Sequence, residues 1–294
     1  MPATGHLVTT TTDDGLLLHG FFAPTPSSGP ALLLVHGLTA NFYRLPYVHL
    51  LAGRAQRTGW AFLTANTRGH DIMTTVYTAD PDRSLRLGSA YERFGECVVD
   101  IRAWLDWLEV QGHRRVVLLG HSLGAAKAVH YAARTGDARL LALGVLSPAD
   151  LSLIARREGD QFSRLLQWAH RQVRAGRPQE LFVPATDEHV PMSAQSLVDL
   201  FGPDAPAHIF RFADPHRSWP DLPEVRLPLF ALMGTEGEYV DGDPRAALEA
   251  IARQARRAPS CTLRLIPGAR HNYRGHEEHV VAAVAEWLES MFSP

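Results

Sequence analysis

The residue with the clearest chemical signal is Ser122, which lies in the run Gly-His-Ser-Leu-Gly at positions 120–124. A strand-like apolar run, 115–119, precedes it, and a helical pattern, 125–133, follows it. A glycine on each side lets the chain turn tightly, so that the serine hydroxyl stands free at the end of the strand. The first N–H groups of the helix would favour negative charge developing there. The pattern predicts a nucleophilic serine rather than an ordinary strand-to-helix turn.

A nucleophilic serine needs a base, and the best candidate lies near the carboxyl end of the chain. His271 follows the last strand-like run and precedes an amphipathic helical pattern. Its imidazole could take the proton of Ser122 and return it to a leaving group. His276 and His279 are the alternatives. Both fall at the start of the helical pattern, where we expect them to face solvent.

The elements that must position these residues are short apolar runs alternating with amphipathic helical patterns. This alternation predicts parallel β-α-β units and a mostly parallel central sheet. Before them, two β-rich runs flank Asp13-Asp14-Gly15, which indicates an antiparallel hairpin at the edge of the sheet. The buried strand-like runs are 31–37, 60–67, 115–120, 140–147, 227–234 and 261–268.

One interval, after the sixth strand, is too long for an ordinary connection. Residues 160–176 show helical spacing and end in Gly-Arg-Pro, and Ser193 is a candidate N-cap for a second helix over 193–201. We therefore predict a helical cap, or lid, over 150–226. The core would comprise 1–149 and 227–294.

Composition excludes several classes of protein. The 294 residues are 46% hydrophobic and 20% charged, which is typical of a globular chain. The net charge of −2 argues against binding nucleic acid by bulk electrostatics. No apolar run approaches the roughly 18 residues of a membrane span, and no secretory signal is visible, so we expect a soluble, cytoplasmic protein. The single lysine, Lys127, falls on a different helix face from Ser122, where packing or solvent exposure is expected.

These motifs resemble the α/β-hydrolase superfamily, from about Leu32 to the carboxyl end. The runs 66–71, 90–94 and 120–125 are similar to bacterial serine esterase-like members. The runs 238–240 and 271–275 also resemble a group that includes fungal siderophore esterases. The resemblance implies the α/β-hydrolase fold and a hydrolase whose cap shapes the choice of substrate.

The resemblance also implies an oxyanion hole. In this fold it pairs the backbone N–H after the nucleophile with an N–H from the loop after the third strand. Here those groups belong to Leu123 and Leu38, and their side chains matter little. His36, just before this loop, is expected to be a packed, hydrogen-bonded residue.

The triad acid is where the sequence departs from the superfamily pattern. The usual position, three residues beyond Gly234, is occupied by Gly237. Glu238 and Glu236 flank it, and either side chain is long enough to reach His271. We prefer Glu238 over Glu236. Asp150, after the sixth strand, is a third candidate because some members of the superfamily place the acid there.

No cofactor is indicated. His36, His70 and His121 lie near strand ends, with Asp71 close in sequence, but no spacing typical of a metal site occurs. Nor does the chain contain a glycine-rich dinucleotide or phosphate loop. We expect neither a metal ion nor a nucleotide cofactor.

The sequence leaves three functions open. The first is a serine hydrolase, a carboxylesterase or thioesterase, which acts on a small-molecule ester or thioester through an acyl-enzyme on Ser122. The second is an acyltransferase or cyclase of natural-product biosynthesis on the same fold. The third is a ligand-binding or sensing module with vestigial chemistry, since a fold does not determine a function. The substrate and the oligomeric state stay open.

Overall fold

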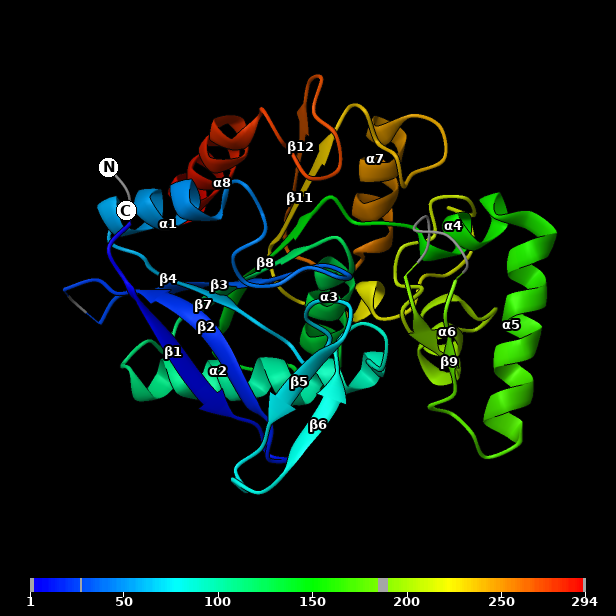
Figure 1. Ribbon diagram of the computed structural model, residues 1–294. Helices are drawn as coiled ribbons and strands as arrows, with labels where there is room; N and C mark the ends of the chain where they lie inside the picture. Colours follow the sequence, from blue (N-terminus) through cyan, green and yellow to red (C-terminus); the bar gives the residue numbers. More distant parts are fainter. Residues whose placement is uncertain (1–2, 27, 185–189, 293–294) are drawn as a thin grey trace.

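The apolar runs of the sequence form one eight-stranded sheet in a computed structural model that describes residues 3–26, 28–184 and 190–292 (Figure 1). The strand order is β1-β2-β4-β3-β7-β8-β11-β12. Because β3, β4, β7 and β11 are buried along their whole length, their residues are nearly all apolar rather than alternating with polar ones. The strands are β1 (His6–Thr11), β2 (Leu17–Ala23), β3 (Ala31–Val35), β4 (Ala61–Ala65), β7 (Val116–His121), β8 (Leu140–Leu146), β11 (Leu229–Gly234) and β12 (Cys261–Ile266).

The sheet is antiparallel at one edge and parallel elsewhere, as predicted. β1 pairs with β2, and β2 with β4, in antiparallel fashion. All other neighbours, from β4 through β3, β7, β8 and β11 to β12, are parallel. The hairpin turns at Gly15, whose φ of 85° is readily adopted only by glycine. Since the parallel strands end at the same edge, the loops after β3, β7, β8, β11 and β12 lie close together.

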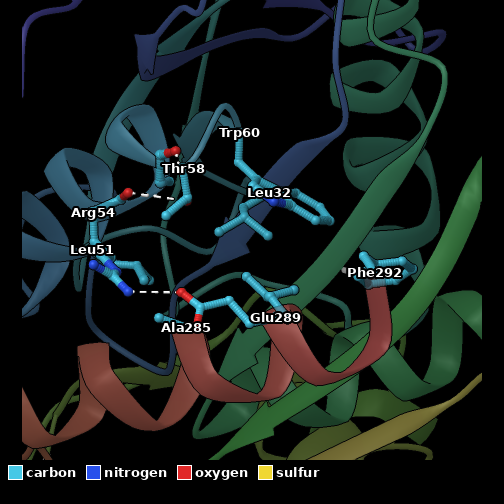
Figure 2. A pocket seen from close by; sticks show the side chains of 10 residues that line it. Leu32, Leu51, Arg54, Thr58, Trp60, Ala285, Glu289 and Phe292 are labelled. Carbon is cyan, nitrogen blue, oxygen red and sulfur yellow. Dashed lines mark hydrogen bonds and ion pairs between the residues drawn. The ribbon is translucent and has the colours of Figure 1, made fainter. Parts of the chain in front are cut away.

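Helices cover both faces of the sheet. The helices α1 (Val48–Arg57) and α8 (Glu277–Phe292) enclose one apolar core with the sheet, and α2 (Cys97–Val110), α3 (Leu123–Thr135) and α7 (Pro244–Gln254) enclose the other. Figure 2 shows the side chains that line a small cavity between α1 and α8. This cavity has a volume of about 180 Å³, and at its edge Arg54 donates to Glu289 at 2.7 Å. Because Leu32 and Trp60 place it near the start of β3 and β4, this cavity lies far from the strand ends that carry Ser122.

The long interval after β8 contains the predicted helices. These elements gather at the right of Figure 1, away from the β1–β2 hairpin. The segment 160–176 corresponds to α5, and Ser193 caps α6 by accepting a hydrogen bond from the N–H of Ser196, as its position predicted. Residues 185–189 of the interval lie outside the described residues. The elements are α4 (Leu151–Arg157), α5 (Gly159–Arg174), β9 (Leu181–Phe182), β10 (Met192–Ser193), α6 (Ala194–Phe201) and the 3₁₀ turn η2 (Leu222–Glu224).

A second hairpin was not predicted. β5 (Thr74–Tyr77) and β6 (Ser84–Leu87) pair with each other, and Thr78 bridges to Leu16. The 3₁₀ turn η1 (Phe94–Glu96) then leads into α2. Among the described residues, no helix combines the length and the apolar character needed to cross a bilayer.

Candidate active site

The turn that carries Ser122 is as tight as the sequence predicted. β7 ends at His121 and α3 begins at Leu123, so Ser122 alone makes the turn, with a strained φ of 57°. A Cβ at Gly120 would lie 2.1 Å from the carbonyl oxygen of Gly124, and one at Gly124 would lie 2.3 Å from that of Val35. Both positions therefore require glycine, and the serine hydroxyl projects beyond the ends of the strands.

His271 meets the serine. Its Nε2 lies 2.9 Å from Ser122 Oγ, although 149 positions separate the two residues. The loop after β12 is held in place by Tyr273, whose hydroxyl donates to the carbonyl of Leu232 at 3.0 Å, and by the ring of His121, which bonds the His271 carbonyl at 3.0 Å. The alternatives His276 and His279 pack against each other at the start of α8, with ring centroids 5.7 Å apart.

The electrostatics of the site favour a neutral imidazole. Burial lowers the pKa of His271 well below its usual 6.5, and neighbouring His121 lowers it further. The pKa of His121 is itself lowered to about 4 by burial. The ring of Tyr239 packs edge-on against that of His271, with centroids 4.5 Å apart, and helps to exclude water. A neutral His271 is able to accept the Ser122 proton.

The carboxylate of Glu238 contacts the main chain of His271 and not its ring. One carboxylate oxygen accepts a hydrogen bond from the backbone N–H of His271 at 2.7 Å, and the other lies 3.1 Å from Nε of Arg270. Among the described residues, no carboxylate bonds Nδ1 of the His271 ring. The preferred acid therefore lies beside the base, but it contacts the peptide group rather than the imidazole.

The other two candidate acids are placed differently. Glu236 is exposed, and its backbone N–H, not its carboxylate, bonds the Ala269 carbonyl. Asp150 is buried and serves as the N-cap of α4. Its carboxylate accepts from the N–H of Leu153 and from the hydroxyl of Ser152, and it also accepts from the N–H of Ala213 at 3.0 Å. Asp150 therefore joins two parts of the inserted segment rather than serving His271.

The backbone groups expected to form the oxyanion hole lie beside the serine. Gly37 packs so closely that a Cβ there would be 2.8 Å from Ser122 Cβ. Leu38 and Leu123 line the same cavity as Ser122, and their N–H groups make no hydrogen bond with any described residue. Both donors are therefore free to bind a ligand oxygen.

This cavity has a volume of about 610 Å³, within the range of small-molecule sites. The inserted segment contributes Leu151 and Ile154 to its wall. Trp168 of α5 does not line the cavity and packs against Phe182 instead. Its mouth includes three arginines, Arg44, Arg270 and Arg274.

The histidines near the strand ends are held by protein groups. His36 bonds the Gly37 carbonyl at 2.8 Å and the Thr67 N–H at 3.1 Å, as expected of a packed loop residue. His70 bonds Asp71 at 2.8 Å. Within residues 3–26, 28–184 and 190–292, no group of three or more His, Cys, Asp or Glu side chains is arranged to hold a metal ion.

Sequence reasoning missed several contacts around the site. Arg157 of α4 donates to the carbonyls of Glu238 and Val240, and so ties the inserted segment to the loop that carries the candidate acid. Lys127 is fully buried and forms an ion pair with Glu92, which is also fully buried. The expectation that Lys127 packs is confirmed, and the alternative of solvent exposure is wrong. The only feature of the sequence that singled out Lys127 was that the chain has no other lysine.

Comparison with known proteins assigns the chain to a family. A model described as the alpha/beta hydrolase family matches residues 32–287. The chain belongs to the alpha/beta hydrolase family. This assignment supports a hydrolase enzyme. No curated protein matches the chain.

Solved structures of other alpha/beta hydrolases share its fold at low sequence identity. Est1E from Butyrivibrio proteoclasticus with bound ferulic acid is 21% identical, with a TM-score of 0.67 over 98% of this chain and 100% of its own. The Pyrococcus furiosus esterase Pf2001 is 18% identical, with a TM-score of 0.64 over 98% and 91%. A dienelactone hydrolase from Anabaena variabilis is 16% identical, with a TM-score of 0.56 over 98% of both chains. At these identities the likeness shows the fold alone.

Proposed function

We propose that the protein is a serine hydrolase that cleaves a carboxylic ester or thioester through an acyl-enzyme on Ser122. The observation that carries the proposal is the 2.9 Å contact between Ser122 Oγ and His271 Nε2, at a strained turn in a cavity of substrate size. Serine hydroxyls become nucleophilic when an adjacent base can take the proton. The esterases among the structurally similar proteins support this chemistry for the site.

In the proposed reaction, His271 accepts the hydroxyl proton as Ser122 Oγ attacks the acyl carbon. The N–H groups of Leu38 and Leu123 bind the oxygen that becomes negative. His271 then gives the proton to the leaving alkoxide or thiolate. Water, activated by the same imidazole, releases the acid and restores Ser122. Glu238, the acid that we assign, holds the His271 loop and provides negative charge near the imidazolium.

We further propose that the inserted segment 150–226 acts as a cap over this site. Leu151 and Ile154 on the cavity wall, and the bonds of Arg157 to the 238–240 loop, support this role. The cap would exclude water and shape the pocket, while the chemistry stays with the core.

A fluorophosphonate probe tests the nucleophile directly. We expect one adduct per chain, located by peptide mass spectrometry at Ser122. Ser122→Ala should fold, lose the adduct and lose hydrolysis of p-nitrophenyl butyrate by at least about 10³-fold. Ser290→Ala, on the distant helix α8, is the matched control and should behave like the wild type. Labelling of another residue, or an active Ser122→Ala protein, would refute the proposal.

A further inference from the structure

Lys127 and Glu92 form a buried ion pair, which the proposed reaction steps do not use. Lys127 lies on the helix that follows Ser122. Lys127 on α3 and Glu92 on the loop before η1 each have fully buried side chains. Burying two charges costs several kcal/mol per ion unless further bonds compensate. The contacts of Lys127 beyond Glu92 therefore indicate what the pair does.

Thr67 connects Lys127 to His36 by hydrogen bonds. The Nζ of Lys127 donates to Thr67 Oγ1 at 3.0 Å. The backbone N–H of Thr67 donates to Nε2 of His36 at 3.1 Å, and Thr67 Oγ1 lies 3.3 Å from the same nitrogen. A lysine ammonium has only donors, so Thr67 Oγ1 must accept from it. The hydroxyl proton of Thr67 is then left to point at His36.

These contacts determine the tautomer of His36. The backbone N–H of Thr67 donates to Nε2, so that nitrogen must be unprotonated and the proton of the neutral ring must reside on Nδ1; the Thr67 hydroxyl adds a second, longer contact to the same lone pair. Nδ1–H then donates to the carbonyl of Gly37, 2.8 Å away. Burial, followed by the charge of Lys127, lowers the pKa of His36 well below 6.5, which keeps the ring in this neutral form.

The Gly37 carbonyl in turn orients the next N–H group. In a trans peptide the C=O and the N–H point in opposite directions, and none of the described peptide bonds is cis. A Gly37 carbonyl held by His36 therefore turns the Leu38 N–H away from His36, on the side where Leu38 and Ser122 line the cavity.

We infer that Glu92, Lys127 and Thr67 are positioning residues that aim the Leu38 N–H at the oxyanion through His36. The inference rests on the proposed function, because the oxyanion forms only if Ser122 attacks an acyl group. We call these three residues with His36 the positioning network. Its predicted effect falls on the transition state and not on ground-state binding, because the Leu38 donor interacts most strongly with a fully negative oxygen.

The test compares variants of the network on one substrate and one transition-state analogue. Thr67→Val removes the hydroxyl and retains the shape, and Thr67→Ser restores the hydroxyl. Glu92→Gln combined with Lys127→Met removes both charges, so that no buried charge is left unpaired. Cys97→Ala is the matched control, because Cys97 is also fully buried near the charged pair, but no hydrogen bond among the described residues joins its thiol to the network.

We expect Thr67→Val and the double variant to lower kcat for p-nitrophenyl butyrate about 10-fold and to leave KM within about 2-fold, a smaller loss than removal of an oxyanion donor. The affinity for a trifluoromethyl ketone with the same acyl chain should fall by the same factor. Thr67→Ser should restore both. Cys97→Ala should lower the melting temperature and leave both unchanged.

The inference is overturned if a folded Thr67→Val protein retains the wild-type kcat and ketone affinity. It is also overturned if the losses follow the melting temperature, with Cys97→Ala as impaired as the network variants. If the double variant does not fold, Thr67→Val and Thr67→Ser decide the question. A wild type that is acylated at neither Ser122 nor elsewhere overturns the proposed function itself, which separates that failure from failure of the network.

Discussion

At the scale of single residues, the unusual feature is that Glu238 holds His271 by its backbone N–H. A triad acid ordinarily bonds the imidazole, where it selects the tautomer and stabilises the imidazolium. Here the Glu238 carboxylate accepts from the backbone N–H of His271 instead of the ring, and it also forms an ion pair with Arg270. The negative charge is still close to the ring, but an amide could replace the carboxylate as acceptor for the N–H. The two contributions can therefore be separated.

We expect Glu238→Gln to lower kcat about 10²-fold, the lower end of the range for triad acids, because the glutamine retains the bond to His271 and loses only the charge. Glu238→Ala should be worse, since it loses both. Steady-state kinetics on p-nitrophenyl butyrate measures the difference. Glu236→Gln is the matched control and should stay within about 2-fold. A greater loss in Glu236→Gln than in Glu238→Gln would mean that the acid is Glu236.

The pH dependence follows from the burial of His271. The base must be neutral to accept a proton, and burial lowers its pKa well below 6.5. The rate is therefore lost only when the pH falls through the lowered pKa, and kcat/KM should stay level from pH 8 to below pH 6.5. The pH–rate profile of the free enzyme tests this. An acid limb centred at or above pH 6.5 would show that the imidazole is less buried than described.

The positions of Ser122 and His271 were predictable because local rules define them. The serine lies between two glycines where a strand turns into a helix, and the histidine follows the last strand of the sheet. The geometry of Glu238 was not predictable, because a carboxylate in an irregular loop can bond the main chain or the ring without any change in the sequence pattern. The partnership of Lys127 with Glu92 also escaped prediction, since it joins side chains from elements distant in sequence.

At the scale of elements, the strand-to-helix alternation was sufficient to predict the sheet. Continuous apolar runs and clear N-caps, such as Ser193 before α6, carry strong local signals. The β5–β6 hairpin was not predicted because its strands are short and only Val76 among their residues is buried, so they lack an apolar pattern. The wall of the pocket was predicted less well, because helical spacing shows which residues are apolar but not which cavity they face.

The segment α4 should control substrate choice. Ile154 lines the cavity, so Ile154→Ala enlarges it and should shift kcat/KM toward longer acyl chains by about 1–3 kcal/mol relative to p-nitrophenyl acetate. A series of p-nitrophenyl esters of graded length measures the shift. Leu165→Ala on α5 is the control, because Leu165 packs on the core without lining the cavity. A uniform loss on every ester in Ile154→Ala would mean that this residue only maintains the fold.

At the scale of the whole molecule, charge is distributed unevenly. The chain as a whole has a net charge of −2, yet the mouth of the cavity contains three arginines and one carboxylate. That carboxylate, on Glu238, already pairs with Arg270. The histidines of the cavity are held neutral by burial. The entrance is therefore positive although the protein is not, and clefts of one sign concentrate ligands of the other.

This asymmetry predicts a preference for esters with a negative group at the distal end of the acyl chain. At low salt, the mono-p-nitrophenyl ester of succinic acid should show a kcat/KM about 10-fold above that of p-nitrophenyl butyrate, and the preference should shrink at about 0.5 M NaCl because the arginines are exposed and screened. Arg44→Gln combined with Arg274→Gln should abolish it. Arg86→Gln combined with Arg83→Gln, on the exposed β5–β6 hairpin, makes the same change in net charge away from the cavity and should leave the preference intact. Equal rates on both esters at low salt would show that the arginines serve only solvation, and the apolar wall of Leu38, Leu151 and Ile154 would then be the determinant of specificity.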